Sequence, residues 1–324
     1  MTLNLRVGDW VEVLSETEIL ATLNERGELE NLPFMPEMVK YCGQRLTVHK
    51  VAHKVCDTVS GAGGLRRMTD AVHLTGARCD GSGHGGCQTA CSMYWKDSWL
   101  RKVDGPAPAR SDDLATGRPL LKLVEVNACK EPDADGAERF SCQATELVRA
   151  TPLCLPFKSP GQYVRDVRSG NAGVMATLRA IFVGLFNHYQ YISRKLLPNR
   201  LLIKGGAPWG FIRGRVTGRT PSGKLDLQPG EVVRIRSKAE IERTLDVNRL
   251  NRGMGFDEEM ARFCGSTARV LNRVDRCIDE KTGRMLTMKS PCIVLDGLVC
   301  AGAYKGNCPR QFVPFWREVW LERV

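Results

Sequence analysis

The chain has 324 residues, of which 43% are hydrophobic and 26% are charged, and its formal net charge is +11. This composition excludes a disordered polymer and leaves room for two or three domains with their own cores. The longest apolar stretch, AGVMATLRAIFVGLF, contains Arg179 and is too short to span a bilayer. The first residues, MTLNLRVGDWVEV, lack the apolar segment of a secretory signal. We therefore expect a cytoplasmic protein that does not insert into membranes.

Thirteen cysteines are present. An odd number of cysteines in a reducing compartment is a poor disulfide framework, so metal ligation or burial has to explain most of them.

Residues 1–103 have the pattern of a small β-domain. The segment DWVEV alternates as a strand does, and Ser15, followed three residues later by Glu18, forms the capping box that starts a helix. A second short helix is expected over residues 36–41. Further strands are expected near residues 45–52, 71–76 and 98–103. Short strands after a glycine-rich start favour an SH3-like small barrel with a helical insertion.

The segment RCDGSGHGGCQTAC, residues 78–91, is the strongest candidate for a site. Cys79, Cys87 and Cys91 are separated by glycines, which let a backbone wrap closely around a ligand. Thiolates are soft donors that select zinc, copper(I) or iron–sulfur clusters. The spacing is not that of a zinc ribbon, whereas the ligand spacing of iron–sulfur clusters varies widely and commonly needs a distant fourth cysteine.

We expect Cys142, ahead of Cys129, to be that fourth ligand, with His73 and His84 as nitrogen alternatives. Trp95 and Trp99 are expected to pack below the site and shield it. An iron–sulfur cluster of the four-iron type is favoured over zinc, and both compete with the simpler interpretation that the thiols only fill space.

The middle region, residues 104–229, differs in composition. DGPAPARSDDLATGRP is expected to be a solvated loop, and two helices follow, the second of which is apolar nearly all round and is expected to be buried between the barrels. Residues 160–229 hold eleven Lys and Arg but only two acidic residues. Arginines beside aromatic rings can bind RNA or a phosphate-bearing substrate, although a solvated basic face without a ligand is the commonest outcome. The candidate anion-binding residues are Lys204, Trp209, Arg213, Arg215 and Arg219.

Residues 230–324 repeat the first domain. GEVVRIRSKAEIERTLDVNRLNRGMGFDEEMARFCG aligns without a gap with the segment that begins at Gly8, at an offset of 222, and the offset becomes 221 further on. The predicted architecture is therefore α+β, mainly β: two homologous SH3-like barrels with helical insertions, residues 1–103 and 230–324, joined by the helical linker 104–229.

The repeat separates the cysteines into two classes. Four of them recur in both copies, as Cys42/Cys264, Cys56/Cys277, Cys79/Cys300 and Cys87/Cys308. The others, Cys91, Cys129, Cys142, Cys154 and Cys292, occur once. A cysteine that builds the shared fold should occur twice, whereas a ligand of one site can occur once. Cys292, Cys300 and Cys308 are a possible second site, although structural thiols are the simpler interpretation there.

GDWVEV near the start, LPFMPEM at 32–38 and the cysteine segment at 78–91 together resemble a bacterial protein family with duplicated SH3-like units and an RCDGSxHGGCQxxC motif. The resemblance covers most of the chain and implies a place in gene neighbourhoods for polysaccharide or specialised-metabolite synthesis. It implies no particular activity, so no catalytic residue is carried over from it.

These observations lead to two functional hypotheses. The first is a cysteine-ligated metalloprotein, an enzyme or accessory factor of a biosynthetic pathway, with an anionic substrate or partner. The second is a non-catalytic nucleic-acid-binding protein whose cysteines are structural or hold zinc. The chain has neither a Walker motif nor Gly-x-Ser-x-Gly nor His-Glu-x-x-His, which leaves His84 as the best candidate for acid–base catalysis. The oligomeric state is not indicated.

Overall fold

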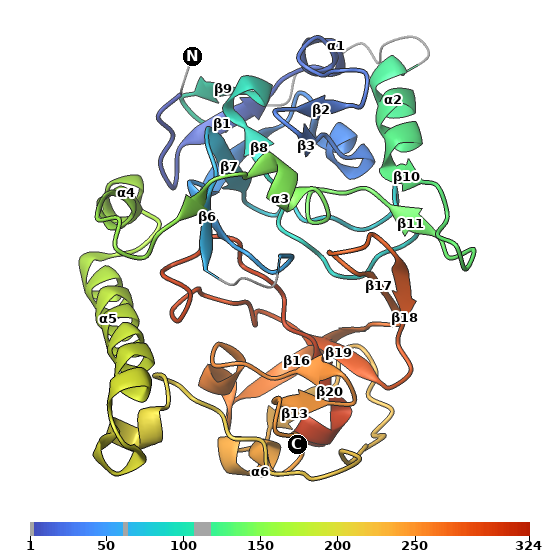
Figure 1. Ribbon diagram of the computed structural model, residues 1–324. Helices are drawn as coiled ribbons and strands as arrows, with labels where there is room; N and C mark the ends of the chain where they lie inside the picture. The colour runs from blue at the N-terminus through green and yellow to red at the C-terminus, as the bar shows by residue number, and fades with distance from the viewer. Residues whose placement is uncertain (1–2, 61–63, 107–117) are drawn as a thin grey trace. The chain divides into compact units, whose positions relative to one another are not determined.

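The computed structural model describes residues 3–60, 64–106 and 118–324 (Figure 1). Most of the expected solvated loop, residues 107–117, lies outside this range. The chain forms two compact units: unit 1 contains residues up to Val174 with 276–287 and 308–311, and unit 2 contains 175–275, 288–307 and 312–324. Both are mixed α/β structures with antiparallel sheets and few helices.

The main sheet of unit 1 has five antiparallel strands in the order β8-β7-β4-β1-β9. Their bounds are β1 Trp10–Val13, β4 Arg45–Val51, β7 Ala71–Leu74, β8 Trp95–Lys96 and β9 Leu100–Val103. Within the described residues β8 and β9 are unpaired edges of this sheet, so the expected closed barrel is not formed.

The main sheet of unit 2 has the equivalent order, β20-β19-β16-β13-β21. Its strands are β13 Val232–Ile235, β16 Thr267–Arg273, β19 Cys292–Leu295, β20 Trp316–Arg317 and β21 Leu321–Arg323. The pairing registers also correspond: Trp10 pairs with Thr47 and Val232 with Arg269, both at the offset of 222. The sequence repeat is thus also a repeat of strand order and register.

Capping boxes at the first residues of two short helices explain why helices are inserted between the strands. In each copy a capping box precedes a short helix: Ser15 and Glu18 cap α1 (Glu16–Leu20), and Ser237 and Glu240 cap α6 (Lys238–Glu242), as the sequence predicts. The 3₁₀-helices η1 (Pro36–Tyr41) and η5 (Met260–Phe263) follow, and η2 (Asp97–Trp99) and η6 (Glu318–Trp320) each lie between the last two strands of a sheet.

Tryptophan pairs fill the two cores. Phe34 meets Trp99 edge-on at 5.1 Å, and Phe256 meets Trp320 at 5.2 Å, in the geometry that aromatic rings prefer. Trp95 and Trp99 are both completely buried in the core of unit 1, a cluster that also contains Cys142 and against which Cys79 and Cys91 pack, but neither ring lines the pocket described below.

Smaller elements complete the units. Unit 1 also contains β2 Glu28–Leu29, β3 Leu32–Pro33, β5 Lys54–Cys56, β6 Leu65–Arg67, α2 Pro119–Ala128, β10 Cys129–Lys130, β11 Arg139–Phe140, α3 Leu147–Ala150, β12 Cys154–Leu155, α4 Gly161–Ser169, β17 Arg276–Ile278 and β18 Met285–Thr287. Unit 2 also contains β14 Leu250–Asn251, β15 Met254–Gly255, η3 Asn199–Leu201 and η4 Ile203–Gly206. The hairpin β17–β18 belongs to the second repeat by sequence, yet it lies beside β11 in unit 1, where Phe140 N–H donates to the Gly283 carbonyl (2.8 Å; Figure 1).

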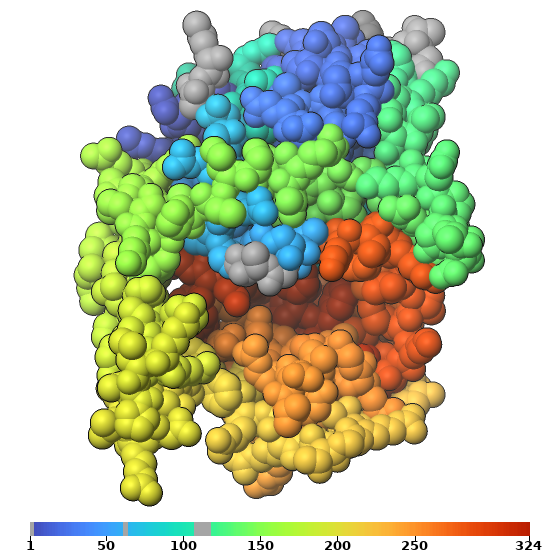
Figure 2. Space-filling model, viewed as in Figure 1, coloured from blue at the N-terminus to red at the C-terminus, as the bar shows by residue number. Residues whose placement is uncertain are grey.

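Helix α5 (Val174–Leu196) begins at the end of unit 1 and otherwise belongs to unit 2. The expectation that it is buried is wrong for much of its surface, because Leu178, Phe182 and Leu185 are more than half exposed, and the helix lies at the surface in Figure 2 (yellow-green). Its buried positions carry small or polar side chains such as Thr177 and Ala180. Among the described residues, no helix combines the length and the apolar character that a bilayer crossing requires.

Candidate metal centre

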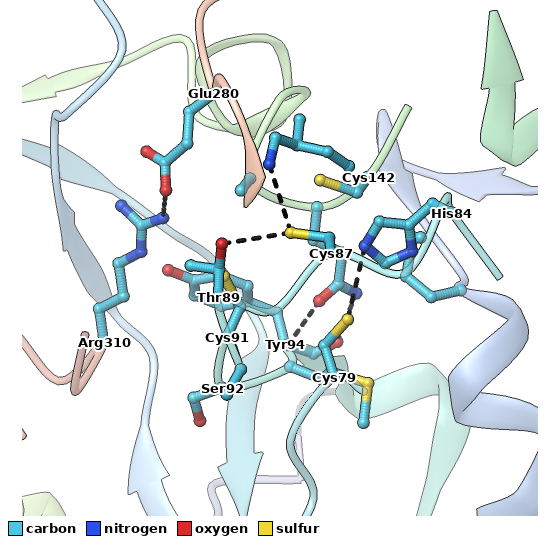
Figure 3. A pocket seen from close by; sticks show the side chains of 16 residues that line it. Cys79, His84, Cys87, Thr89, Cys91, Ser92, Tyr94, Cys142, Glu280 and Arg310 are labelled. Atoms are coloured by element: carbon cyan, nitrogen blue, oxygen red, sulfur yellow. Dashed lines mark hydrogen bonds and ion pairs between the residues drawn. The ribbon is translucent and has the colours of Figure 1, made fainter. Parts of the chain in front are cut away.

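A pocket in unit 1 brings together cysteines that are distant in sequence (Figure 3). Cys79, Cys87, Cys91 and Cys142 line it together with His84, and we call this cavity the cysteine pocket. Ile278, Glu280 and Arg310 close it from the two segments of the second repeat that belong to unit 1. Its volume of about 40 Å³ exceeds the roughly 10–15 Å³ that one water needs, so a group larger than a single water fits.

The glycines of the cysteine loop allow its tight fold. Gly81 has φ +75°, and a Cβ there would lie 2.1 Å from the Cys87 carbonyl oxygen. The Gly81 carbonyl accepts hydrogen bonds from His84 N–H and Gly86 N–H, and Cys79 N–H donates to the Cys91 carbonyl at 2.9 Å. Only a residue without a side chain fits at position 81, so the loop closes around the pocket as the glycine pattern predicts.

Glu37 orients His84. The carboxylate Oε1 lies 2.8 Å from His84 Nδ1, and Nε2 on the other side of the ring lies 3.6 Å from Cys79 Sγ. Glu37 also accepts the Gly83 N–H at 2.8 Å, and His84 is only 2% exposed. A carboxylate that fixes one imidazole nitrogen while the other faces a ligand site is the usual arrangement behind metal-binding histidines. Sequence reasoning missed Glu37; the signal was a single acidic residue in the apolar stretch LPFMPEM.

The pKa values of His84 and Glu37 are shifted in opposite directions. Burial alone would lower the pKa of His84, but contacts with Cys79, Cys87 and Glu37 outweigh burial and raise it. Burial alone would raise the pKa of Glu37, but the contact with His84 outweighs it and holds that pKa below its usual range. Glu37 and His84 therefore form a buried ion pair next to the thiols.

The four thiols differ in their surroundings. Burial raises the pKa values of Cys79, Cys91 and Cys142. The pKa of Cys87 is lowered, because hydrogen bonds from His84, Thr89 and the Ile278 N–H outweigh its burial. A metal ion has to displace the protons of the three neutral thiols, which makes binding stronger as the pH rises.

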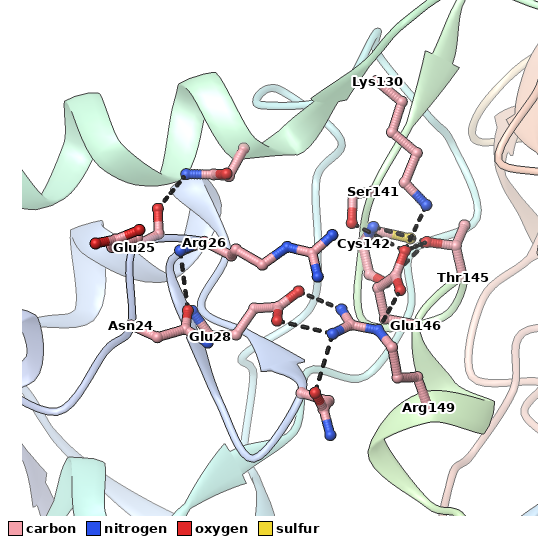
Figure 4. Close-up of polar contacts among 12 residues, drawn as sticks. Asn24, Glu25, Arg26, Glu28, Lys130, Ser141, Cys142, Thr145, Glu146 and Arg149 are labelled. Carbon is pink, nitrogen blue, oxygen red and sulfur yellow. Dashed lines mark hydrogen bonds and ion pairs between the residues drawn. The ribbon is translucent and has the colours of Figure 1, made fainter.

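Cys142 is held by a polar network at the start of α3 (Figure 4). Its N–H donates to Thr145 Oγ1 at 2.9 Å, and its carbonyl accepts the Glu146 N–H at 3.0 Å. Glu146 is itself fixed by Lys130 Nζ at 2.5 Å and by Arg149 Nε at 2.9 Å. Arg149 also pairs with Glu28, and the network thereby connects Cys142 to the strand β2.

The sulfur, nitrogen and carboxylate atoms at the cysteine pocket are of the kinds that bind metals, and their spacing indicates which metal they could hold. Among the described residues, Glu37, Cys79 and His84 are the group whose donor atoms all lie within 4.8 Å of one another. The remaining three sulfurs line the same pocket without joining such a tight group. One tetrahedral zinc ion, with Zn–S bonds of about 2.3 Å, would need four donors clustered more closely than that.

Other predicted ligands are not brought to the pocket. Cys129 is exposed on β10, and His73 is buried in β7 with Nδ1 3.0 Å from the Met93 carbonyl oxygen, where burial lowers its pKa to about 3. Of the suggested second set, Cys292 and Cys300 belong to unit 2, whereas Cys308 belongs to unit 1 and lies beside Cys56.

The predicted anion-binding residues all belong to unit 2. The side chains of Lys204, Arg213, Arg215 and Arg219 are exposed, and Lys204 Nζ lies 5.2 Å from the centre of the half-buried Trp209 ring. The edge of the Trp209 ring meets Phe182 and Phe186 of α5.

No protein-family model, no curated protein and no solved structure matches this chain. The function therefore has to be inferred from the cysteine pocket and the charged surfaces themselves.

Proposed function

We propose that the cysteine pocket holds an iron–sulfur cluster through Cys79, Cys87, Cys91 and Cys142. The observation that carries this proposal is that four cysteines from two distant segments, 79–91 and 142, line one largely buried cavity. Buried thiols that only fill space would point into separate apolar sites instead. Among the described residues, the four sulfurs do not form a group as tight as that of Glu37, Cys79 and His84, which favours a cluster over a single zinc ion.

The chain's own residues have distinct parts in this proposal. The four thiolates bind the cluster, which supplies redox or Lewis-acid chemistry. Glu37 holds the protonated His84 next to Cys79, where His84 can donate a hydrogen bond to a thiolate or a proton to a bound substrate. Arg310 and Glu280 add a charged wall to the same pocket. We further propose that this site serves an enzyme or accessory factor of a biosynthetic pathway.

The test is metal analysis of protein purified without oxygen. Wild type should be brown and contain iron and acid-labile sulfide, and Cys91→Ser should lose both. Cys129→Ser is the matched control, because Cys129 is exposed and outside the pocket. If the wild-type protein is colourless and contains stoichiometric zinc, the site is a zinc site and the cluster proposal is wrong. If Cys91→Ser retains its iron, Cys91 is not a ligand.

A second candidate function is nucleophilic catalysis by Cys79. The chain Cys79–His84–Glu37 has the order of a nucleophile, a base and the group that orients the base. It is the weaker candidate because burial raises the pKa of Cys79, whereas nucleophilic cysteines have lowered values, and because it leaves the three other thiols unexplained. Rapid labelling of Cys79 by iodoacetamide at neutral pH in metal-free protein, lost in Glu37→Gln, would favour it.

Two further features, the strand order of the sheets and the exposed arginines of unit 2, extend the proposal. The order of each main sheet, with a 3₁₀-turn between its last two strands, supports an SH3-like origin of both repeats, although the sheets are open. The exposed arginines of unit 2 support an anionic partner, either a phosphate-bearing substrate or RNA.

A further inference from the structure

A pair of cysteines lies outside the metal site described above. Cys56 ends the strand β5, and its N–H donates to Cys308 Sγ at 3.1 Å. Both residues belong to unit 1, neither lines the cysteine pocket, and no disulfide joins them in the structure. Two thiols that are 252 positions apart in the chain are thus neighbours.

The repeat explains how this pair arises. Cys308 is the counterpart of Cys87, and Cys56 is the counterpart of Cys277. The Ile278 N–H, one residue beyond Cys277, donates to Cys87 Sγ at 3.4 Å, whereas in the other repeat the Cys56 N–H itself donates to Cys308 Sγ. The cysteine loop of each repeat therefore contacts a hairpin of the other repeat. Cys87 contacts the hairpin β17–β18, and Cys308 contacts the hairpin β5–β6. Cys87 faces the cysteine pocket, but Cys308 faces another thiol.

A buried cation accompanies the pair. Arg310 is 4% exposed; its guanidinium donates to Thr58 Oγ1 at 2.7 Å and pairs with Glu280. The hydrogen bond from Cys308 lowers the pKa of Cys56 to about 6, against its burial and with the help of Arg310. The same contact, together with burial, raises the pKa of Cys308. The two pKa values are shifted in opposite directions, so Cys56 is the thiol of the pair that loses its proton more readily.

The two cysteines differ in exposure. The residue Cys56 is partly exposed, whereas Cys308 is only 3% exposed. An attacking thiolate has to reach its partner, while the resolving thiol has to reach only the attacking sulfur.

We propose that Cys56 and Cys308 form a redox-active dithiol that exchanges with a disulfide such as oxidised glutathione. The Cys56 thiolate attacks one sulfur of the disulfide, a mixed disulfide forms, and the first thiol leaves as a thiolate. The Cys308 sulfur, after loss of its proton, attacks Cys56 Sγ and releases the second thiol. Starting from the Cys56 thiolate and the Cys308 thiol, the protein loses two electrons and one proton. The disulfide takes up the two electrons and two protons, one of them from the solvent, and becomes two thiols.

Oxidation of Cys56 and Cys308 would also affect the cysteine pocket. Oxidation ties β5 to the segment 308–311, whose Arg310 lines that pocket. The proposal does not depend on the metal, because neither thiol belongs to the proposed ligand set.

The test is disulfide mapping of the full chain in glutathione buffers of graded ratio, followed by alkylation, digestion and mass spectrometry. We expect a Cys56–Cys308 cross-linked peptide that accumulates as the buffer becomes more oxidising and disappears on reduction. The exposed Cys129 and Cys154 should carry at most single glutathione adducts, and Cys129→Ser should leave the cross-link unchanged. Absence of the cross-link at every ratio would overturn the proposal, as would a preferred bond from either thiol to a pocket cysteine.

Two variants assign the roles. Cys308→Ser should trap a mixed disulfide of Cys56 with glutathione, whereas Cys56→Ser should leave Cys308 unmodified. The reverse pattern would overturn the assignment of Cys56 as the attacking thiol. If a variant fails to fold, the relative alkylation rates of the two thiols in the wild type decide the same question. Iron content, measured in the same samples, reports on the metal proposal separately.

Discussion

At the scale of single residues, the decisive feature is that Glu37 determines which nitrogen of His84 faces the thiols. The carboxylate occupies Nδ1 at 2.8 Å and leaves Nε2 directed at Cys79. Glu37 Oε2 is buried, and in the part of the chain that the structure describes it has no hydrogen-bond partner. A buried carboxylate oxygen without a partner is costly, and the ion pair of Glu37 with His84 offsets part of that cost.

Replacing Glu37 by Gln should weaken metal binding by up to about 10-fold, the lower end of what loss of an outer partner costs, because the amide no longer holds His84 charged and oriented beside Cys79. Competition with a chelator measures the affinity. Glu25→Gln is the control, since Glu25 is exposed and outside the site. An unchanged affinity in Glu37→Gln would show that the pair has no part in the metal site.

A second residue-scale prediction compares two glycines. Gly81 and Gly76 have nearly the same φ, +75° and +73°, but only at Gly81 would a Cβ collide with the chain. Gly76→Ala should therefore cost only the conformational strain of about 1–2 kcal/mol, and it should keep the metal. Gly81→Ala should cost more in thermal unfolding and lose the metal. Equal effects of both substitutions would contradict the close packing of the loop.

At the scale of elements, loops and short turns place the residues of the candidate site, and this limits what the sequence can predict. The capping boxes at Ser15 and Ser237 and the strand repeat could be predicted, because they depend on local residue types. Glu37 could not, because its importance appears only when η1 meets the cysteine loop. The exposed face of α5 was predicted wrongly, because helical periodicity alone does not say what covers a helix.

The turn that carries Cys142 should give the protein an acid-sensitive element. Burial alone would raise the pKa of Glu146, but Lys130 and Arg149 outweigh it and lower the pKa to about 2 from a usual 4.5. This carboxylate therefore stabilises the fold above about pH 4.5, and the contribution is lost as the pH falls toward 2. After allowance for solvent screening, it is worth about 1 kcal/mol.

Glu146→Gln should accordingly lower the melting temperature at pH 7 by about 2–4 °C, and the difference from wild type should shrink below pH 4.5. Thermal unfolding followed by circular dichroism across this pH range measures it. A difference that stays constant with pH would mean that the charge of Glu146 does not stabilise the turn.

At the scale of the whole molecule, two copies of one strand pattern display different side chains. Unit 1 has the cysteine pocket, which includes the unrepeated Cys91 and Cys142, and unit 2 has the exposed arginines. The sequence indicated the duplication and the separation of repeated from single cysteines. It did not indicate that segments 276–287 and 308–311 join unit 1, because such long-range contacts leave no local pattern.

The basic residues of unit 2 should bind polyanions by charge. Replacing Arg213, Arg215 and Arg219 by Gln should weaken binding to single-stranded RNA or heparin and make it less dependent on salt, by up to about 0.7–0.9 logarithmic units of slope per lost contact. Fluorescence titration at several salt concentrations measures this slope. Wild-type binding that is insensitive to salt, or absent at low salt, would contradict a nucleic-acid or phosphate partner for this face.

The most direct test of the proposed metal centre is a crystal structure of anaerobically purified protein with diffraction data collected on both sides of the iron absorption edge. The proposal predicts anomalous density for iron inside the cysteine pocket, bonded to the sulfurs of Cys79, Cys87, Cys91 and Cys142, with His84 still paired to Glu37. A pocket without iron density in protein never exposed to oxygen, or with its four sulfurs pointing apart, would contradict it.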